Sequence, residues 1–127
     1  AGVDCIILPA KGGASITPDA IKTSAGALLR IDVCKVPNLK TAVFYLQQSD
    51  VQIVTATEKA EDYLYDVDLT GATAIVMGAE DKGISDAIRK LATAEAKIPM
   101  AGNIGSLNVS AAASVILYEA VRQRITK

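Results

Sequence analysis

Residues 98–119 read IPMAGNIGSLNVSAAASVILYE. A cluster of glycine, asparagine and serine leads here into a long run of small and apolar residues. A helix that is apolar on nearly every side is typically buried, either inside a domain or against another subunit. The polar cluster before it suits two roles, because it can cap the helix or close around a ligand with backbone amides and short side chains. We therefore predict a buried helix over about residues 107–124.

Short apolar runs alternate with helix-like segments along the rest of the chain. This alternation is typical of βαβ units, in which parallel strands are joined by helices. The sequence predicts an α/β fold with a mostly parallel sheet and helices on both faces. The predicted strands are Cys5–Leu8, Ile31–Val36, Val51–Thr55, Ala74–Met77 and Ala96–Met100.

Three helix starts carry capping residues. Thr17-Pro18-Asp19 combines an N-cap with a first-turn proline and acid, and Pro37-Asn38 ends a strand before a helix over Leu39–Gln48. Ser85-Asp86 precedes a helix over Ala87–Leu91.

Composition excludes several classes of protein. The chain of 127 residues can form one compact domain, and its 13 Lys and Arg are scattered at a net charge of −1, unlike the basic stripe of a self-sufficient nucleic-acid binder. Cys5 and Cys34 lie in apolar runs and there is no histidine, so we expect buried thiols and no metal site. The sequence contains neither a membrane span nor a signal peptide, and we expect a cytoplasmic protein.

Three segments that follow predicted strands carry glycine and short polar residues: residues 55–57, 78–85 and 101–110. The carboxyl ends of parallel strands meet at one edge of a sheet, where ligands usually bind. Ordinary turn chemistry also explains Gly78 and Gly83, and Glu80 can be a solvated loop acid. The spacing matches neither a dinucleotide-binding motif nor a P-loop, so NAD and ATP are not favoured.

Two further groups of residues are weaker candidates. Lys11-Gly12-Gly13 can touch a phosphate or form a surface loop. Tyr63 and Tyr65 lie among acidic residues, which disfavours base stacking on RNA, and we predict that they pack against the protein.

Taken together, IVMGAEDKGIS at residues 75–85 and the opening stretch resemble motifs 2 and 3 of the SpoU (TrmH) family of RNA 2′-O-ribose methyltransferases, in the SPOUT superfamily. The likeness runs from AGVDCIIL at the start to YEAVRQR at residues 118–124. It implies a deep trefoil knot near the C-terminus and a homodimer formed through the last helix.

The resemblance also implies a cofactor, S-adenosylmethionine, and a set of site residues. Glu80, Ser106 and Asn108 match the polar positions of the methyl-transfer centre. The cofactor would lie against backbone groups and apolar walls supplied by Thr55, Ala56, Gly78, Ile98, Met100 and Leu107.

The implied activity is methylation of an RNA ribose, with a guanosine of 23S rRNA as the expected target. Motif 1 of the family would precede AGVDCIIL, so we expect residues 1–127 to be a methyltransferase domain without its first strand and helix, taken from a longer chain. Three alternatives remain: a tRNA methyltransferase, a binding module without turnover, and a generic nucleotide-binding domain.

Overall fold

The computed structural model describes residues 5–9, 32–78, 84–101 and 109–126. The chain divides into two compact units, residues 2–42 and residues 43–127. In the first unit, β1 (Cys5–Pro9) and β2 (Asp32–Val36) form a two-stranded parallel sheet. Cys5 and Cys34 are exposed, so the prediction of buried thiols is wrong. A sheet of only two strands covers little of its own surface. Even apolar side chains on its strands therefore stay accessible to water.

The second unit contains a three-stranded parallel sheet with the strand order β4-β3-β5. Its strands are β3 (Gln52–Ala56), β4 (Thr73–Met77) and β5 (Ala94–Ala96). The predicted parallel α/β fold is confirmed, and β3 and β4 lie within one residue of their predicted positions. The last strand was predicted too late, at Ala96–Met100. Its pairing with β3 ends at Ala96, and Lys97 instead pairs with Tyr63.

Two helices begin within one residue of the starts that their capping residues predict, although the one expected over Ala87–Leu91 spans Asp86–Arg89. The helix α2 (Leu39–Gln48) has the predicted bounds, and the Thr41 backbone N–H donates to Asn38 Oδ1 at 3.2 Å. Ser85 caps α3 (Asp86–Arg89) by accepting a bond from the Ile88 N–H. The last helix, α4, spans Val109–Ile125. The helix predicted after Thr17 lies outside the described residues.

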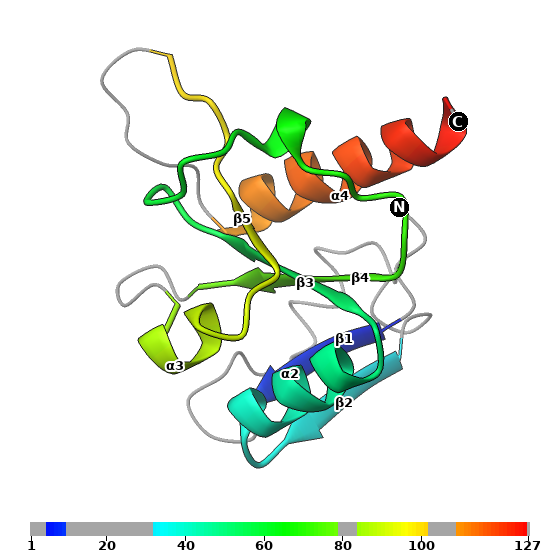
Figure 1. Ribbon diagram of the computed structural model, residues 1–127. Helices are drawn as coiled ribbons and strands as arrows, with labels where there is room; N and C mark the ends of the chain where they lie inside the picture. Colours follow the sequence, from blue (N-terminus) through cyan, green and yellow to red (C-terminus); the bar gives the residue numbers. More distant parts are fainter. Residues whose placement is uncertain (1–4, 10–31, 79–83, 102–108, 127) are drawn as a thin grey trace, which may run out of the picture. The chain divides into compact units, whose positions relative to one another are not determined.

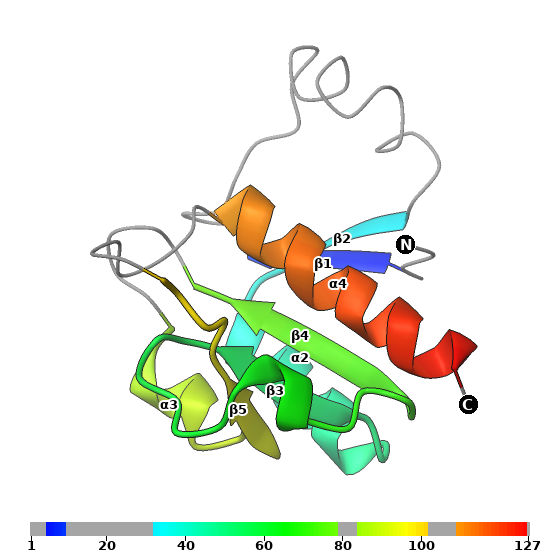
Figure 2. The ribbon, with the colours of Figure 1, turned by 90° about the horizontal axis from the view of Figure 1, so that it is seen from above.

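Helices cover both faces of the sheet in residues 43–127. Figures 1 and 2 show α4 lying across one face and α3 on the opposite side. Ile116 of α4 packs in a cluster with Val54 of β3 and Ala96 of β5. Side chains alternate along a strand, so Ile53 and Thr55 point away from α4, toward the side of α3. The buried Ile88 belongs to α3 on that side.

The helix α4 is buried along one side rather than all round. Ile116 and Glu119 are buried, whereas Ser114 and Tyr118 are exposed. The buried carboxylate of Glu119 receives hydrogen bonds from Arg122 and Gln123. Among the described residues, no helix combines the length and the apolar character that crossing a membrane requires.

Tyr63, the N-cap of the short 3₁₀ helix η2 (Leu64–Asp66), and Tyr65, within that helix, are exposed, so the prediction that they pack against the protein is wrong. Leu64 fills the core at this point, and its neighbours Tyr63 and Tyr65 therefore point outward, 47% and 55% exposed. The ammonium of Lys97 lies 4.9 Å from the centre of the Tyr63 ring, a cation–π contact.

Candidate functional site

The carboxyl ends of the three strands in the second unit meet at one edge. Ala56 at the end of β3 is level with Met77 of β4 and with Ala96 of β5. The Thr57 N–H extends the β3–β5 pairing by donating to the Ala96 carbonyl at 3.0 Å. The chain therefore leaves β3, β4 and β5 side by side at this edge, which is the arrangement that parallel strands need to build a shared ligand site.

Five of the predicted cofactor-binding residues lie in the described part of the chain: Thr55, Ala56, Gly78, Ile98 and Met100. Ala56 and Ile98 pack partly buried against the core cluster around Ile116, and Gly78 and Met100 are half-buried. Apolar side chains and a glycine thus lie at or just beyond the edge where the strands end. Whether they touch a cofactor remains a prediction.

The remaining predicted site residues are Glu80, Ser106, Leu107 and Asn108. All four lie outside the described residues, as does the Lys11-Gly12-Gly13 segment.

Thr55 is fully buried and its hydroxyl is already used inside the protein. It donates to Glu95 Oε2 at 3.0 Å, and Thr55 and Glu95 are directly paired across β3 and β5. Glu95 in turn accepts two bonds from Arg89 of α3, from Nε at 2.9 Å and from a terminal nitrogen at 3.1 Å. This fork is the strongest geometry available to a carboxylate and a guanidinium. Thr55, Glu95 and Arg89 are called the edge network below.

The charges of the edge network favour its ionised form. Hydrogen bonds from Arg89, and to a smaller extent from Thr55, lower the pKa of Glu95 against the opposing effect of burial. The same bonds to Glu95 raise the pKa of Arg89. Sequence reasoning missed this network, because Thr55 and Glu95 are 40 positions apart and only the pairing of β3 with β5 brings them together.

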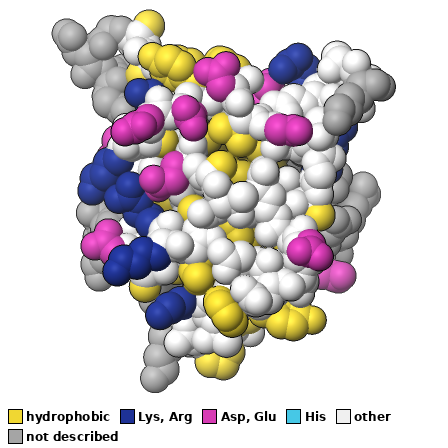
Figure 3. Space-filling model, viewed as in Figure 1, with side chains coloured by type: hydrophobic (Ala, Val, Ile, Leu, Met, Phe, Trp, Pro, Cys, Tyr) yellow, Lys and Arg dark blue, Asp and Glu magenta, His cyan; other side chains and the backbone are white. Residues whose placement is uncertain are grey.

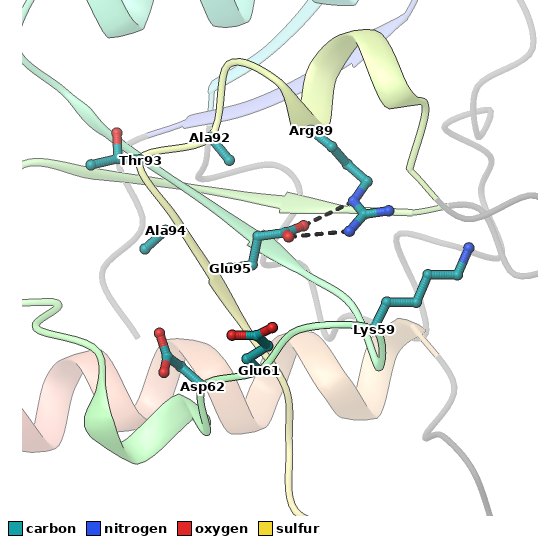
Figure 4. A pocket seen from close by; sticks show the side chains of 8 residues that line it. All are labelled: Lys59, Glu61, Asp62, Arg89, Ala92, Thr93, Ala94 and Glu95. Carbon is teal, nitrogen blue, oxygen red and sulfur yellow. Dashed lines mark hydrogen bonds and ion pairs between the residues drawn. The ribbon is translucent and has the colours of Figure 1, made fainter.

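A hollow of about 450 Å³ opens beside β5 and the edge network (Figure 4). Lys59 and Arg89 line it together with the acidic side chains of Glu61, Asp62 and Glu95. The lining mixes both charges and so indicates no ligand of a single charge. Within the described residues, no group of three or more His, Cys, Asp or Glu side chains is placed to hold a metal ion.

Comparison with known proteins decides the family. Residues 1–118 match the SpoU rRNA Methylase family. The chain belongs to the SpoU rRNA methylase family. This membership confirms the resemblance that motifs 2 and 3 indicated. It is consistent with the parallel sheet, in which the carboxyl ends of β3, β4 and β5 share one edge.

SpoU relatives of known name cover the whole chain. It is 41% identical over 127 residues to the 23S rRNA (guanosine-2'-O-)-methyltransferase RlmB of Pseudomonas putida, covering 100% of this chain and 51% of the relative. It is 44% identical over 124 residues to the enzyme of the same name from Xylella fastidiosa, covering 98% and 50%. The chain thus spans about half the length of the curated relatives it matches.

Solved SpoU structures have the same fold. The SpoU methyltransferase AviRb from Streptomyces viridochromogenes, in complex with AdoMet, superposes with a TM-score of 0.89 at 31% identity, covering 99% of this chain and 52% of that one. The TrmH/SpoU tRNA modifying enzyme of A. aeolicus gives a TM-score of 0.79 at 32% identity, covering 95% and 62%.

Proposed function

We propose that this chain is a domain of an S-adenosylmethionine-dependent RNA 2′-O-ribose methyltransferase that modifies a guanosine of 23S rRNA. The observation that carries the proposal is the identity of 41% to RlmB of Pseudomonas putida along the entire chain. The AdoMet complex of AviRb, similar over 99% of this chain, supports the choice of cofactor.

The residues at the strand edge suit this cofactor. Ala56, Ile98 and Met100 offer the apolar surface that an adenine ring needs, and Gly78 allows close approach of the backbone. We propose that these residues bind the cofactor together with Thr55 and Leu107. Thr55 would contribute its backbone, because its hydroxyl is bonded to Glu95.

When bound, the cofactor supplies a methyl group on a positively charged sulfur, which becomes a neutral thioether as the ribose 2′-oxygen takes the methyl. The protein must hold the hydroxyl in line with the carbon–sulfur bond, since such orientation removes several kcal/mol of entropic barrier. We propose that Glu80, Ser106 and Asn108 orient the hydroxyl, and that Ser106 and Asn108, which can donate hydrogen bonds, stabilise the negative charge that develops on its oxygen. As the oxygen–carbon bond forms and the carbon–sulfur bond breaks, the proton of the hydroxyl passes to water.

We further propose that the C-terminal segment forms a trefoil knot and that the protein is a cytoplasmic homodimer joined through α4. Two large apolar side chains of α4, Tyr118 and Ile125, are 61% and 74% exposed, as an interface helix requires before association. Sedimentation at micromolar concentration tests the dimer, and a stable monomer would refute it.

Calorimetric titration of the chain with S-adenosylhomocysteine tests the cofactor proposal. We expect saturable binding that the Leu107→Asp variant loses, while ATP and NAD do not bind. Binding of ATP or NAD with no competition from S-adenosylhomocysteine would favour a generic nucleotide-binding domain instead.

Methyl transfer to RNA tests the reaction. With labelled cofactor, we expect 2′-O-methylguanosine in unmodified 23S rRNA. Transfer to tRNA alone would support the alternative suggested by the A. aeolicus tRNA modifying enzyme. Tight cofactor binding without transfer to either RNA would favour a binding module.

A further inference from the structure

The edge network joins three elements that border the segments assigned to the cofactor. Thr55 lies one residue before the end of β3, and Glu95 lies one residue before the end of β5. Arg89 lies on α3, the helix that follows the segment beginning at Gly78. A single set of hydrogen bonds therefore fixes the relative positions of all three elements.

The geometry of the network restricts motion at this edge. Thr55 is fully buried, and the carboxylate of Glu95 is held on one side by the Thr55 hydroxyl and on the other by the Arg89 fork. Figure 4 shows the Arg89 side chain reaching from α3 to Glu95 on β5. Carboxylates held on two sides cannot change rotamer without losing several bonds, and α3 cannot shift from the sheet without breaking the fork.

We propose that Arg89, Glu95 and Thr55 act together as positioning residues that preorganise the cofactor-binding edge of the sheet. The inference rests on the proposed function, since it assigns the network a role at the proposed cofactor site. The network acts on the cofactor indirectly, through the backbone at Ala56 and Thr57, which follow Thr55 directly. A preformed edge binds its ligand more tightly because less ordering is required at the moment of binding.

The contrasting possibility is that the network only stabilises the fold. Both roles predict a lower free energy of unfolding for Glu95→Gln, so stability cannot separate them. The affinity of fully folded protein for the cofactor product can separate them. A contact that only stabilises the fold leaves the dissociation constant of the folded protein for S-adenosylhomocysteine unchanged.

The test is calorimetric titration of the 127-residue chain with S-adenosylhomocysteine, at a temperature where every variant is shown by circular dichroism to be folded. We expect Glu95→Gln and Arg89→Met to raise the dissociation constant about tenfold, the lower end of what loss of a supporting contact costs at metal sites. Arg89→Lys keeps the charge but not the fork, and we expect it to restore only part of the affinity.

Two control variants remove a positive charge without touching the network. Lys90→Met acts at the exposed C-cap of α3, and Arg122→Met breaks the other forked ion pair, with Glu119 on α4. Both are expected to bind S-adenosylhomocysteine like the wild type. Because the network acts as a unit, the double variant Thr55→Val, Glu95→Gln should lose little more affinity than Glu95→Gln alone.

The outcomes separate the inference from the proposed function. Absence of binding by the wild-type chain would overturn the proposed function. Wild-type binding that Glu95→Gln leaves unchanged would overturn the positioning role alone, and so would equal losses in the two control variants. Faster amide hydrogen exchange at Thr57 in unliganded Glu95→Gln, with unchanged exchange at the amides in the middle of α4, would support the role, because it would show a local loosening of the edge where the Thr57 N–H is bonded.

Discussion

Gln123, like its neighbour Arg124, hydrogen-bonds α4 to the segment between η2 and β4. Its Oε1 accepts the Leu69 N–H at 2.7 Å, and its Nε2 donates to the Val67 carbonyl and to Glu119 Oε2, each at 2.9 Å. We expect Gln123→Leu to lower the free energy of unfolding by about 2–3 kcal/mol, because it leaves backbone groups beside the core without partners. Urea unfolding followed by circular dichroism measures the loss.

A matched control for this change is Gln48→Leu, at an exposed position at the end of α2. It makes the same chemical substitution where the side chain faces water, and we expect a change within about 0.5 kcal/mol. Equal losses in the two variants would contradict the role assigned to Gln123.

Glu119 makes the stability of the protein depend on pH. Hydrogen bonds from Arg122, and then from Gln123, lower the pKa of this buried carboxyl group. A carboxyl group with a lower pKa in the folded protein stabilises it above the pKa of the unfolded chain, near 4.3 for glutamate, and this stabilisation disappears as the pH falls through the folded value. We therefore expect the urea midpoint to fall between about pH 6 and about pH 3.

The variant Glu119→Gln isolates the contribution of this residue. It should be less stable than the wild type near neutral pH, and its urea midpoint should fall less steeply on acidification. Glu95 also has a lowered pKa and adds to the slope in both proteins. Parallel slopes in the two proteins would show that Glu119 does not carry the effect.

At the scale of one element, the turn that ends α2 holds a backbone conformation that favours glycine. Asp50 has a φ of 65°, and the Val51 N–H donates back to the Leu46 carbonyl at 3.1 Å. Most helices that end in this way place glycine at the left-handed position. We expect Asp50→Gly to raise the free energy of unfolding by about 0.5–1 kcal/mol and Asp50→Ala to lower it, as measured by urea unfolding. A gain from alanine would contradict the argument.

Local patterns predicted α2 well because its signals are local. Asn38 bonds to the helix that it caps, and the apolar period of residues 39–48 needs no distant partner. The strand β5 has no such signal. Its residues Ala94 and Glu95 do not favour strands, and they form one because Val54 and Thr55 lie opposite. The apolar run at Ile98–Met100 instead follows the point where Lys97 turns to pair with Tyr63.

The same distinction applies to the site. Segments following strands were predicted to meet, and the register of β3, β4 and β5 brings their ends level. Predicting the edge network would have required knowing that residue 55 lies opposite residue 95, which is a property of the folded sheet. The hydroxyl of Thr55 therefore carries a role that no motif in the sequence indicates.

At the scale of the whole molecule, the distribution of charge limits how strongly the chain can bind RNA. The net charge is −1, and on the face seen in Figure 3 acidic side chains lie among the basic ones. The three arginines of the described residues are all engaged within the protein. Arg89 and Arg122 pair with glutamates, and Arg124 donates to the carbonyls of Leu69 and Gly71.

We therefore expect this chain alone to contact few RNA phosphates. Each contact contributes about 0.7 to the slope of the logarithm of affinity against the logarithm of salt concentration for single strands. Fluorescence anisotropy of a labelled rRNA fragment, titrated at several salt concentrations, should give weak binding with a slope smaller in magnitude than about 3. A steeper slope would mean that basic side chains contact many phosphates. That result would contradict the argument from the mixed surface charge. Saturating S-adenosylhomocysteine should leave the slope unchanged, because it neutralises no phosphate.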